Sequence, residues 1–273
     1  MGRRTTRHRA QRVLAGGDVR GEVTTLAVEE PLEIRLAGQP FVVTMRTPGD
    51  DMDLAAGHLV SEGAVWHRDH LPEICYCTTV SGRAEQDYNT LTVTLSPDIP
   101  TPRSARASTM SSACGVCGVD SIDEVRRSTH FPAGPAEPLI DAGVLLALPE
   151  RLREQQKVFG RTGGVHAAGL FTPAGELLCL REDVGRHNAV DKVVGWALRA
   201  GRLPLRDTVL QVSGRASFEL VQKTSMAGIP VMAAVSAPSS LAVDLAEDVG
   251  VTLIGFSRGD RATVYTHPER IRD

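Results

Sequence analysis

Two cysteines separated by two residues, Cys114 and Cys117, are the residues of this sequence best suited to chemistry. A Cys-x-x-Cys pair places two sulfur atoms on one turn, an arrangement used for zinc binding, for a redox disulfide and for sulfur transfer. Gly115 and Gly118 carry no side chains, so another molecule can approach the sulfurs closely. The pair follows a Ser-, Pro- and Arg-rich stretch over 96–113, which predicts a mobile loop that carries the thiols to partners.

The other three cysteines, Cys75, Cys77 and Cys179, leave several interpretations open. Cys75 and Cys77 together with the Cys-x-x-Cys pair would satisfy one structural zinc ion, although a Cys-x-Cys spacing is shorter than zinc sites usually have. A thioredoxin-like motif would need the Cys-x-x-Cys pair directly after a strand, whereas here a long loop precedes it. Ordinary packing is the simplest interpretation of the three remaining cysteines. Five cysteines in a chain of this size do not predict a disulfide framework.

His166 follows two glycines, Gly163 and Gly164, at the start of an apolar run. Zinc nucleobase deaminases carry H-x-E followed by P-C-x-x-C. In this chain Ala168 occupies the position of the acid–base glutamate, and the Cys-x-x-Cys precedes the histidine, so deaminase activity is not expected. A hydrogen-bonded strand histidine is the plainer interpretation of His166.

Three further segments lie where predicted strands end. Residues 182–192 (EDVGRHNAVDK) hold seven polar groups, more than a helix cap at Asp183 needs, and predict a site rim that includes Arg186 and His187. The second segment opens a predicted helix, whose free N–H groups favour a phosphate, and its candidate residues are Ser213, Gly214 and Arg215. The third segment offers a carboxylate for a purine base and guanidiniums for phosphate, and its candidates are Phe256, Ser257, Arg258, Gly259, Asp260 and Arg261. Together they predict an anionic, nucleotide-like ligand.

These segments must be positioned by strands and helices, and the sequence divides into four parts. Residues 1–20 hold six arginines and one aspartate and predict a basic flexible arm. Residues 21–97 predict a small α+β unit, and residues 98–140 a mobile loop region that carries the CGVCG motif. Over 141–273 a strand–helix–strand series predicts a largely parallel sheet flanked by helices, and an amphipathic helix is expected over 142–159. The expected fold class is α/β, α+β overall.

Composition narrows the function classes. The chain has 273 residues, 42% of them hydrophobic, and a formal net charge of −3. Nucleic-acid-binding proteins show a clear basic excess, so no nucleic-acid partner is expected. The apolar stretches are too short to span a bilayer, and no apolar run follows the basic N-terminus as in a secretory signal. We therefore expect a cytoplasmic protein without a membrane partner.

In this order and spacing, CGVCG, GGVHAA, EDVGRHNAVDKVVG, SGRASFELVQK and FSRGDR resemble the formate dehydrogenase accessory sulfurtransferase family, FdhD. The resemblance extends from about Val23 to Thr266. It implies a sulfur carrier that receives persulfide sulfur from a cysteine desulfurase. The carrier passes this sulfur to the molybdenum of the bis(molybdopterin guanine dinucleotide) cofactor, which is then inserted into formate dehydrogenase.

The resemblance also implies roles for particular residues. Cys114 carries the persulfide and Cys117 assists, while the segment from Phe256 to Arg261 binds the guanine dinucleotide cofactor. It further implies a homodimer with a cytidine-deaminase-like mixed sheet, and GDP is expected to mimic the bound cofactor. A rival hypothesis from another class is a zinc-stabilised nucleotide-binding regulatory protein.

Overall fold

A computed structural model describes residues 2–77, 88–102, 109–110, 128–131, 134, 137 and 139–273. Its centre is a six-stranded sheet in the order β10-β9-β11-β12-β13-β14. The strands are β9 (His166–Phe171), β10 (Leu177–Asp183), β11 (Val209–Val212), β12 (Val231–Ala234), β13 (Thr252–Arg258) and β14 (Arg261–Val264). Only the β11–β12 and β12–β13 neighbours are parallel, so the sheet is mixed and not largely parallel. The antiparallel pairs β9–β10 and β13–β14 arise because short turns join them, and such turns permit only antiparallel pairing.

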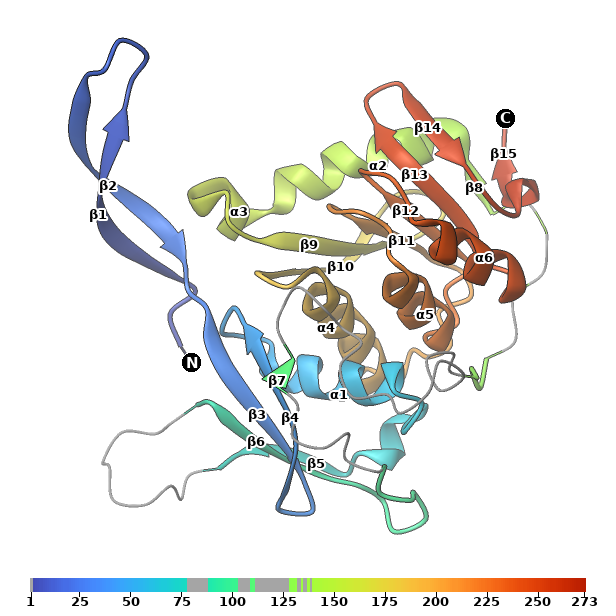
Figure 1. The fold of residues 1–273 in the computed structure, drawn as a ribbon. Coiled ribbons are helices and arrows are strands. Elements are labelled where there is room, and N and C mark those ends of the chain that lie inside the picture. The colour runs from blue at the N-terminus through green and yellow to red at the C-terminus, as the bar shows by residue number, and fades with distance from the viewer. Residues whose placement is uncertain are drawn as a thin grey trace.

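Alternation along the strands explains why helices cover both faces of this sheet. Val231 and Ala233 of β12 belong to one buried apolar cluster, while Met232 and Ala234 belong to the other. Helices α2 (Ala142–Gln155) and α3 (Lys157–Thr162) lie over the first face, and α4 (Arg186–Arg199) and α5 (Phe218–Met226) over the second (Figure 1). Helix α6 (Ser240–Asp248) packs beside α5.

A second sheet has the order β5-β6-β3-β4-β7. Its strands are β3 (Glu30–Leu36), β4 (Gln39–Arg46), β5 (Glu73–Tyr76), β6 (Thr90–Thr94) and β7 (Thr109–Met110). Helix α1 (Asp51–Ser61) lies between this sheet and α4 (Figure 1). The two predicted units are therefore not separately packed, because one apolar cluster runs from Leu32 to Leu253 across both.

Short elements complete the described fold. They are the 3-10 turns η1 (Arg68–His70) and η3 (Pro268–Arg270) and the parallel pair β8 (Ile140–Asp141) and β15 (Ile271–Arg272).

Two regions differ from expectation. The segment predicted as a flexible arm forms strand β1 (Thr5–Val13), which pairs along its whole length with β2 (Val19–Ala27) in a hairpin that projects from the body (Figure 1). Backbone pairing supplies this structure without a buried core, which is why apolar periodicity did not predict it. The helix expected over 142–159 is interrupted at Gln156, where α2 ends and α3 begins.

Candidate functional site

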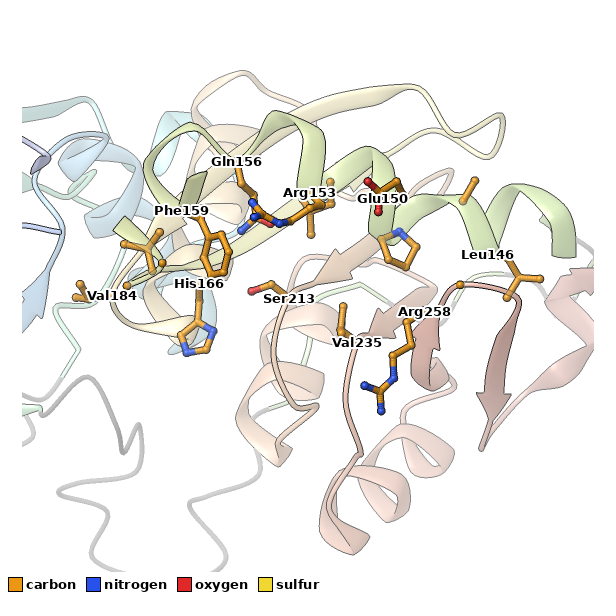
Figure 2. Close-up of a pocket in the computed structure, with 17 residues that line it drawn as sticks. Leu146, Glu150, Arg153, Gln156, Phe159, His166, Val184, Ser213, Val235 and Arg258 are labelled. Carbon is orange, nitrogen blue, oxygen red and sulfur yellow. The ribbon is translucent and has the colours of Figure 1, made fainter. Parts of the chain in front are cut away.

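A pocket of about 870 Å³ opens where four strands of the six-stranded sheet end (Figure 2). The residues that follow or close these strands line it: Val184 after β10, Ser213 after β11, Val235 after β12, and Arg258 at the end of β13. Ligands of open α/β sheets bind outside the carboxyl ends of the strands, where backbone groups are not used in the sheet. The position therefore favours a bound ligand.

Helices α2 and α3 form the opposite wall of the pocket. Leu146, Glu150 and Arg153 project from α2, and Phe159 from α3 (Figure 2). The Arg153 guanidinium carbon lies 4.3 Å from the centroid of the Phe159 ring, within the range of a cation–π contact. This wall combines apolar surface with the guanidinium of an exposed arginine.

Gln156 lies at the break between the two helices and also lines the pocket. Its side chain is 6% exposed, and its amide Nε2 has no hydrogen-bond partner among the described residues. Glu182 explains the break, because its carboxylate accepts hydrogen bonds from the backbone N–H groups of Val158 (2.9 Å) and Phe159 (2.8 Å). A carboxylate at a helix N-terminus satisfies free N–H groups and fixes where the helix begins.

His166 lines the pocket, and Arg186, which lies outside the lining, is close to it beside Gly214. A Cβ atom placed on Gly214 would lie 3.5 Å from His166 Nδ1 and 3.8 Å from Arg186 Cδ, so Gly214 lets both side chains approach the backbone. Burial, followed by the positive charges of Arg186 and His187, lowers the pKa of His166, which favours a neutral imidazole. Arg186 Nε is buried and has no hydrogen-bond partner within the described ranges.

The charge of the pocket favours an anion. Among its described lining residues, the guanidiniums of Arg153 and Arg258 outnumber the single carboxylate of Glu150. Ligand pockets in proteins commonly measure about 300–1,000 Å³. A nucleotide-sized molecule with an apolar ring and a negatively charged end suits both the volume and the lining.

In the segment from Phe256 to Arg261, the residues that line the pocket directly follow a β-bulge. The pairing of β13 with β14 shifts register between Gly255 and Arg258, and Phe256 adopts a positive φ of 50°. The bulge coincides with the point where Arg258 and Gly259 reach the pocket. Ser257 is fully buried, and neither it nor Phe256 lines the pocket. Asp260 and Arg261 are exposed and also lie outside the lining.

Of the segment after β11, too, only one part reaches the pocket. Ser213 lines the pocket, and its hydroxyl accepts a hydrogen bond from the Ala167 N–H at 2.9 Å. Arg215 is exposed and lies outside the lining.

His187 is buried, with Nε2 2.6 Å from Glu219 Oε2 and 3.3 Å from Ser217 Oγ. Burial alone would raise the pKa of Glu219, but the His187 contact and the positive charges of Lys223 and Arg186 together lower that pKa. His187 therefore braces the start of α5 from outside the pocket lining.

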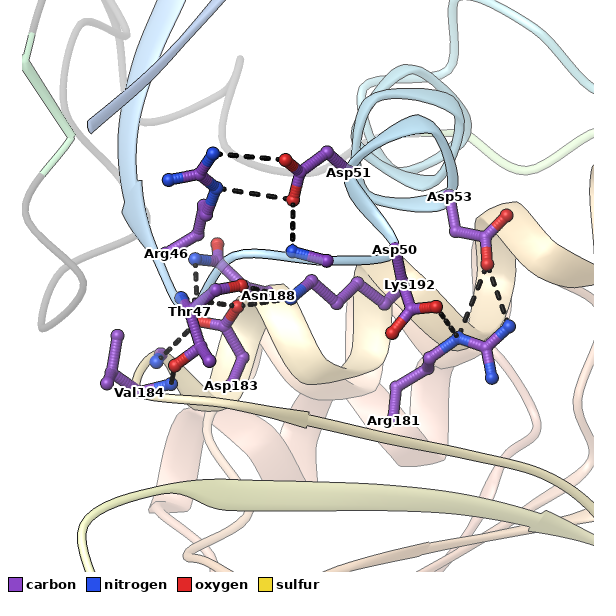
Figure 3. A network of polar contacts seen from close by, with 12 residues as sticks. Arg46, Thr47, Asp50, Asp51, Asp53, Arg181, Asp183, Val184, Asn188 and Lys192 are labelled. Atoms are coloured by element: carbon purple, nitrogen blue, oxygen red, sulfur yellow. Dashed lines mark hydrogen bonds and ion pairs between the residues drawn. The ribbon is translucent and has the colours of Figure 1, made fainter. Parts of the chain in front are cut away.

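Most of the polar groups in 182–192 face the interior and not a site rim (Figure 3). Asp183 is fully buried, and its carboxylate contacts Lys192 Nζ at 2.7 Å and the Thr47 N–H at 3.1 Å. Lys192 also donates to the Thr47 carbonyl at 2.8 Å, and Asn188 donates to the Met45 carbonyl at 2.8 Å. A buried charge needs a close partner and full hydrogen bonding. These groups therefore join α4 to the end of β4.

A second set of ion pairs in Figure 3 ties α1 to its neighbours. The buried Arg46 guanidinium donates to both carboxylate oxygens of Asp51, at 3.2 and 3.0 Å. Arg181 and Arg199 both bind Asp53, from β10 and α4. These ion pairs therefore join α1 to β4, β10 and α4.

The Cys-x-x-Cys pair, Cys114 and Cys117, lies outside the described residues. Strand β7 ends at Met110, four positions before Cys114, and it runs parallel to β4 with Met110 opposite Thr44. Strand β4 leads to Thr47, whose hydroxyl accepts from the N–H of pocket-lining Val184 at 3.1 Å. Strand β7 is therefore directed towards the pocket side of the molecule.

The remaining cysteines differ in environment. Cys179 is buried within the apolar cluster of β10, and this burial raises its pKa to about 12, so the packing interpretation is confirmed for this residue. Cys75 and Cys77 are half-buried, and Cys77 Sγ lies 2.9 Å from Thr92 Oγ1. Within the described ranges, no group of three or more His, Cys, Asp or Glu side chains is placed to hold a metal ion. No described helix is long and apolar enough to cross a membrane.

Several lining residues were not predicted from the sequence. They come from α2 and α3, and the most informative is Gln156. It continues the spacing of the buried residues Leu145, Leu148 and Leu152, so a polar side chain falls on the apolar stripe of the helix. This polar residue on the apolar stripe was the sequence signal that could have identified Gln156.

A mixed α/β fold with a nucleotide-sized pocket at the carboxyl ends of its strands places the chain among α/β ligand-binding proteins. A sequence profile described as the FdhD/NarQ family matches residues 27–272. The chain therefore belongs to the FdhD/NarQ family, as the sequence motifs indicated.

Individual relatives agree with this assignment. A protein of Nocardia farcinica named sulfur carrier protein FdhD is 52% identical over 271 residues, which cover 99% of this chain and 96% of the relative. A protein of Sulfurisphaera tokodaii with the same name is 43% identical over 249 residues, covering 90% and 91% of the two chains. The crystal structure of a protein from Desulfotalea psychrophila, described as a formate dehydrogenase accessory protein, superposes with a TM-score of 0.77 at 25% identity, covering 98% of this chain and 99% of that one.

Proposed function

We propose that this protein is a sulfur carrier in the maturation of formate dehydrogenase. It accepts persulfide sulfur from a cysteine desulfurase and transfers it to the molybdenum of bis(molybdopterin guanine dinucleotide), before that cofactor enters the formate dehydrogenase apoenzyme. The names of the relatives support the sulfur-carrier role and the link to formate dehydrogenase. The protein works in the cytoplasm as a homodimer, on a frame like that of cytidine deaminases.

The observation that carries this proposal is the pocket at the carboxyl ends of the strands, with β7 directed towards its side of the molecule. A volume of about 870 Å³ suits one guanine nucleotide portion of the cofactor. Arg258 supplies a guanidinium for its diphosphate, while Ser213 and Gly259 line the pocket with a hydroxyl and with bare backbone. Gly214 lies outside the lining, next to His166. Arg186 lies outside the lining, so its Nε, which has no partner among the described residues, is not assigned a ligand contact.

The roles of Asp260, Arg261 and Arg215 in this proposal are secondary. All three are exposed and outside the lining, so they act on parts of the cofactor that extend beyond the pocket. Phe256 and Ser257 shape the bulge that places Arg258, and His187 orients α5.

The chemistry belongs to Cys114 and Cys117. The Cys114 thiolate attacks the outer sulfur of the desulfurase persulfide, the S–S bond breaks, and the desulfurase cysteine leaves as a thiolate. Cys117 then attacks the Cys114 sulfur, the second S–S bond breaks, and the outer sulfur leaves as sulfide to the molybdenum substrate. The two cysteines lose two electrons and become a disulfide, which a cellular dithiol reduces back to two thiols.

Mass spectrometry tests the proposal. After incubation with a cysteine desulfurase and cysteine, the protein should gain about 32 Da, one sulfur atom. Cys114→Ala should abolish this gain, and Cys179→Ala, which changes a buried packing residue, should not. An adduct undiminished in Cys114→Ala would overturn the assignment.

A further inference from the structure

The burial of Gln156 is not explained by a contribution to the stability of the fold. Its side chain is 6% exposed at the α2–α3 break, and its Nε2 has no hydrogen-bond partner among the described residues. A buried donor without a partner loses its hydration and gains nothing in return. Such groups are rare in folded proteins, and each needs an explanation. Since Gln156 lines the pocket, a ligand atom can supply the missing acceptor.

The neighbours of Gln156 indicate which part of a ligand lies there. Phe159 offers a ring, and Arg153 lies over that ring at 4.3 Å. Figure 2 shows Gln156 and Phe159 together on one side of the pocket and Arg258 well apart from them. An aromatic ring and a neutral amide suit a base, whereas the guanidinium of Arg258 suits a phosphate.

We propose that Gln156 is the specificity residue of this pocket and donates a hydrogen bond from Nε2 to O6 of a guanine base. At this position guanine presents the acceptor O6 and adenine a donating 6-amino group, while N7 accepts in both bases. The contact favours guanine because the atom of Gln156 without a partner among the described residues is the donor Nε2. This inference rests on the proposed function, because it assumes that the pocket holds a guanine nucleotide.

Glu182 is the positioning residue for this contact. It is 7% exposed and binds the N–H groups of Val158 and Phe159, which directly follow Gln156 in sequence. Both hydrogen bonds fix where α3 starts, and so they hold the Gln156 backbone at the break. The carboxylate acts through the helix and contributes no contact to the base.

Calorimetric titration of the full chain with GDP, ADP and inorganic pyrophosphate tests the proposal, using Gln156→Leu and the matched control Gln155→Leu. Gln155 is the exposed neighbour at the end of α2. Gln156→Leu should weaken GDP binding about tenfold, roughly the loss of one good hydrogen bond, with ADP and pyrophosphate binding nearly unchanged. Gln155→Leu should bind all three as the original protein does.

The melting temperature separates a ligand contact from a structural role. Gln156→Leu replaces an unpartnered buried donor with an apolar group, so its Tm should stay the same or rise. A lower Tm with unchanged GDP affinity would overturn the proposal, as would an equal loss of GDP and pyrophosphate binding, which would place Nε2 on a phosphate. If the unsubstituted protein does not bind GDP, the nucleotide site in the proposed function is wrong. If it binds GDP and Gln156→Leu binds GDP equally well, only the role of Gln156 is wrong.

Discussion

Arg258 and Arg261 lie three positions apart and are both exposed, yet only Arg258 lines the pocket. Arg258→Ala should therefore weaken GDP binding about tenfold, because a charge-assisted contact to phosphate is lost. Arg261→Ala should change the affinity less than about threefold. Titration of GDP into both variants measures the difference, and equal losses would show that the pocket boundary is misplaced.

His58 on α1 gives a prediction for pH. It is buried against Asp191, with Nδ1 3.9 Å from the Asp191 carboxylate, and Glu62 and Lys223 also act on it. Burial outweighs the two carboxylates and lowers the pKa of His58. The unfolded chain, with a histidine pKa of about 6.5, therefore holds this proton at pH values where the folded protein does not.

Stability should consequently fall as the pH drops below about 6.5, by up to about 1.4 kcal/mol per pH unit from this residue. Urea unfolding between pH 7 and pH 5 measures this slope. His58→Gln should flatten it, whereas His8→Gln, at an exposed position of the β1–β2 hairpin, should leave it as it is. A slope that survives His58→Gln in full would contradict the assignment.

At the scale of single residues, three of the binding candidates chosen from turn positions, Ser213, Arg258 and Gly259, line the pocket, whereas the other candidates lie outside the lining. Gln156 was missed because its role depends on a break in a helix that the carboxylate of a distant strand imposes. The polar residue on the apolar stripe of the helix marks the position, but it does not reveal the contact with Glu182.

Among the elements, the contact between α1 and α4 depends on two glycines. A Cβ atom on Gly57 would lie 1.8 Å from the Asp191 carbonyl oxygen, and one on Gly195 would lie 1.8 Å from the Asp53 carbonyl oxygen. The two helix backbones thus approach without side chains between them. Glycine is otherwise unfavourable within a helix, so this contact accounts for both residues.

Gly57→Ala should destabilise the protein by about 3 kcal/mol, because neither backbone can move away easily. The control is Gly143→Ala in α2, where an added Cβ meets nothing within 4 Å. That change should be neutral or stabilise by about 0.5 kcal/mol through helix propensity. Denaturant unfolding measures both, and a neutral Gly57→Ala would show that the helices lie further apart.

The elements themselves were largely predictable. The strands and helices after residue 165 follow the expected order, since each carries its own apolar pattern and turn residues. A strand was expected from Val23, but β1 and its pairing with β2 were not predicted, because Val13, Val19, Val23 and Leu26 are exposed and mark no buried face. Its order comes from backbone pairing, which side-chain patterns report only weakly.

Considered as a whole, the molecule has one apolar core that joins both sheets through α1 and α4. Its two tryptophans, Trp66 and Trp196, pack against this core from different parts of the chain. The sequence analysis predicted separate units because the composition changes near residues 97 and 141. No sequence pattern indicates that α1 and α4, more than a hundred residues apart, pack together.

A shared core predicts a single unfolding transition. Trp66→Phe and Trp196→Phe each leave one tryptophan whose fluorescence reports on one part of the molecule. In each variant, the urea midpoint from tryptophan fluorescence should equal the midpoint from circular dichroism, which reports on the whole fold. Fluorescence that changes well before the circular dichroism signal in either variant would show that the two parts unfold independently.

The central claim is that sulfur on Cys114 is delivered to a substrate whose guanine nucleotide occupies the pocket. The most direct measurement follows the persulfide on the intact protein by mass spectrometry after adding bis(molybdopterin guanine dinucleotide), with and without excess GDP. We predict that the cofactor discharges the Cys114 persulfide and that GDP blocks the discharge by filling the same pocket. Discharge that is insensitive to GDP, or a persulfide carried by another cysteine, would contradict the account.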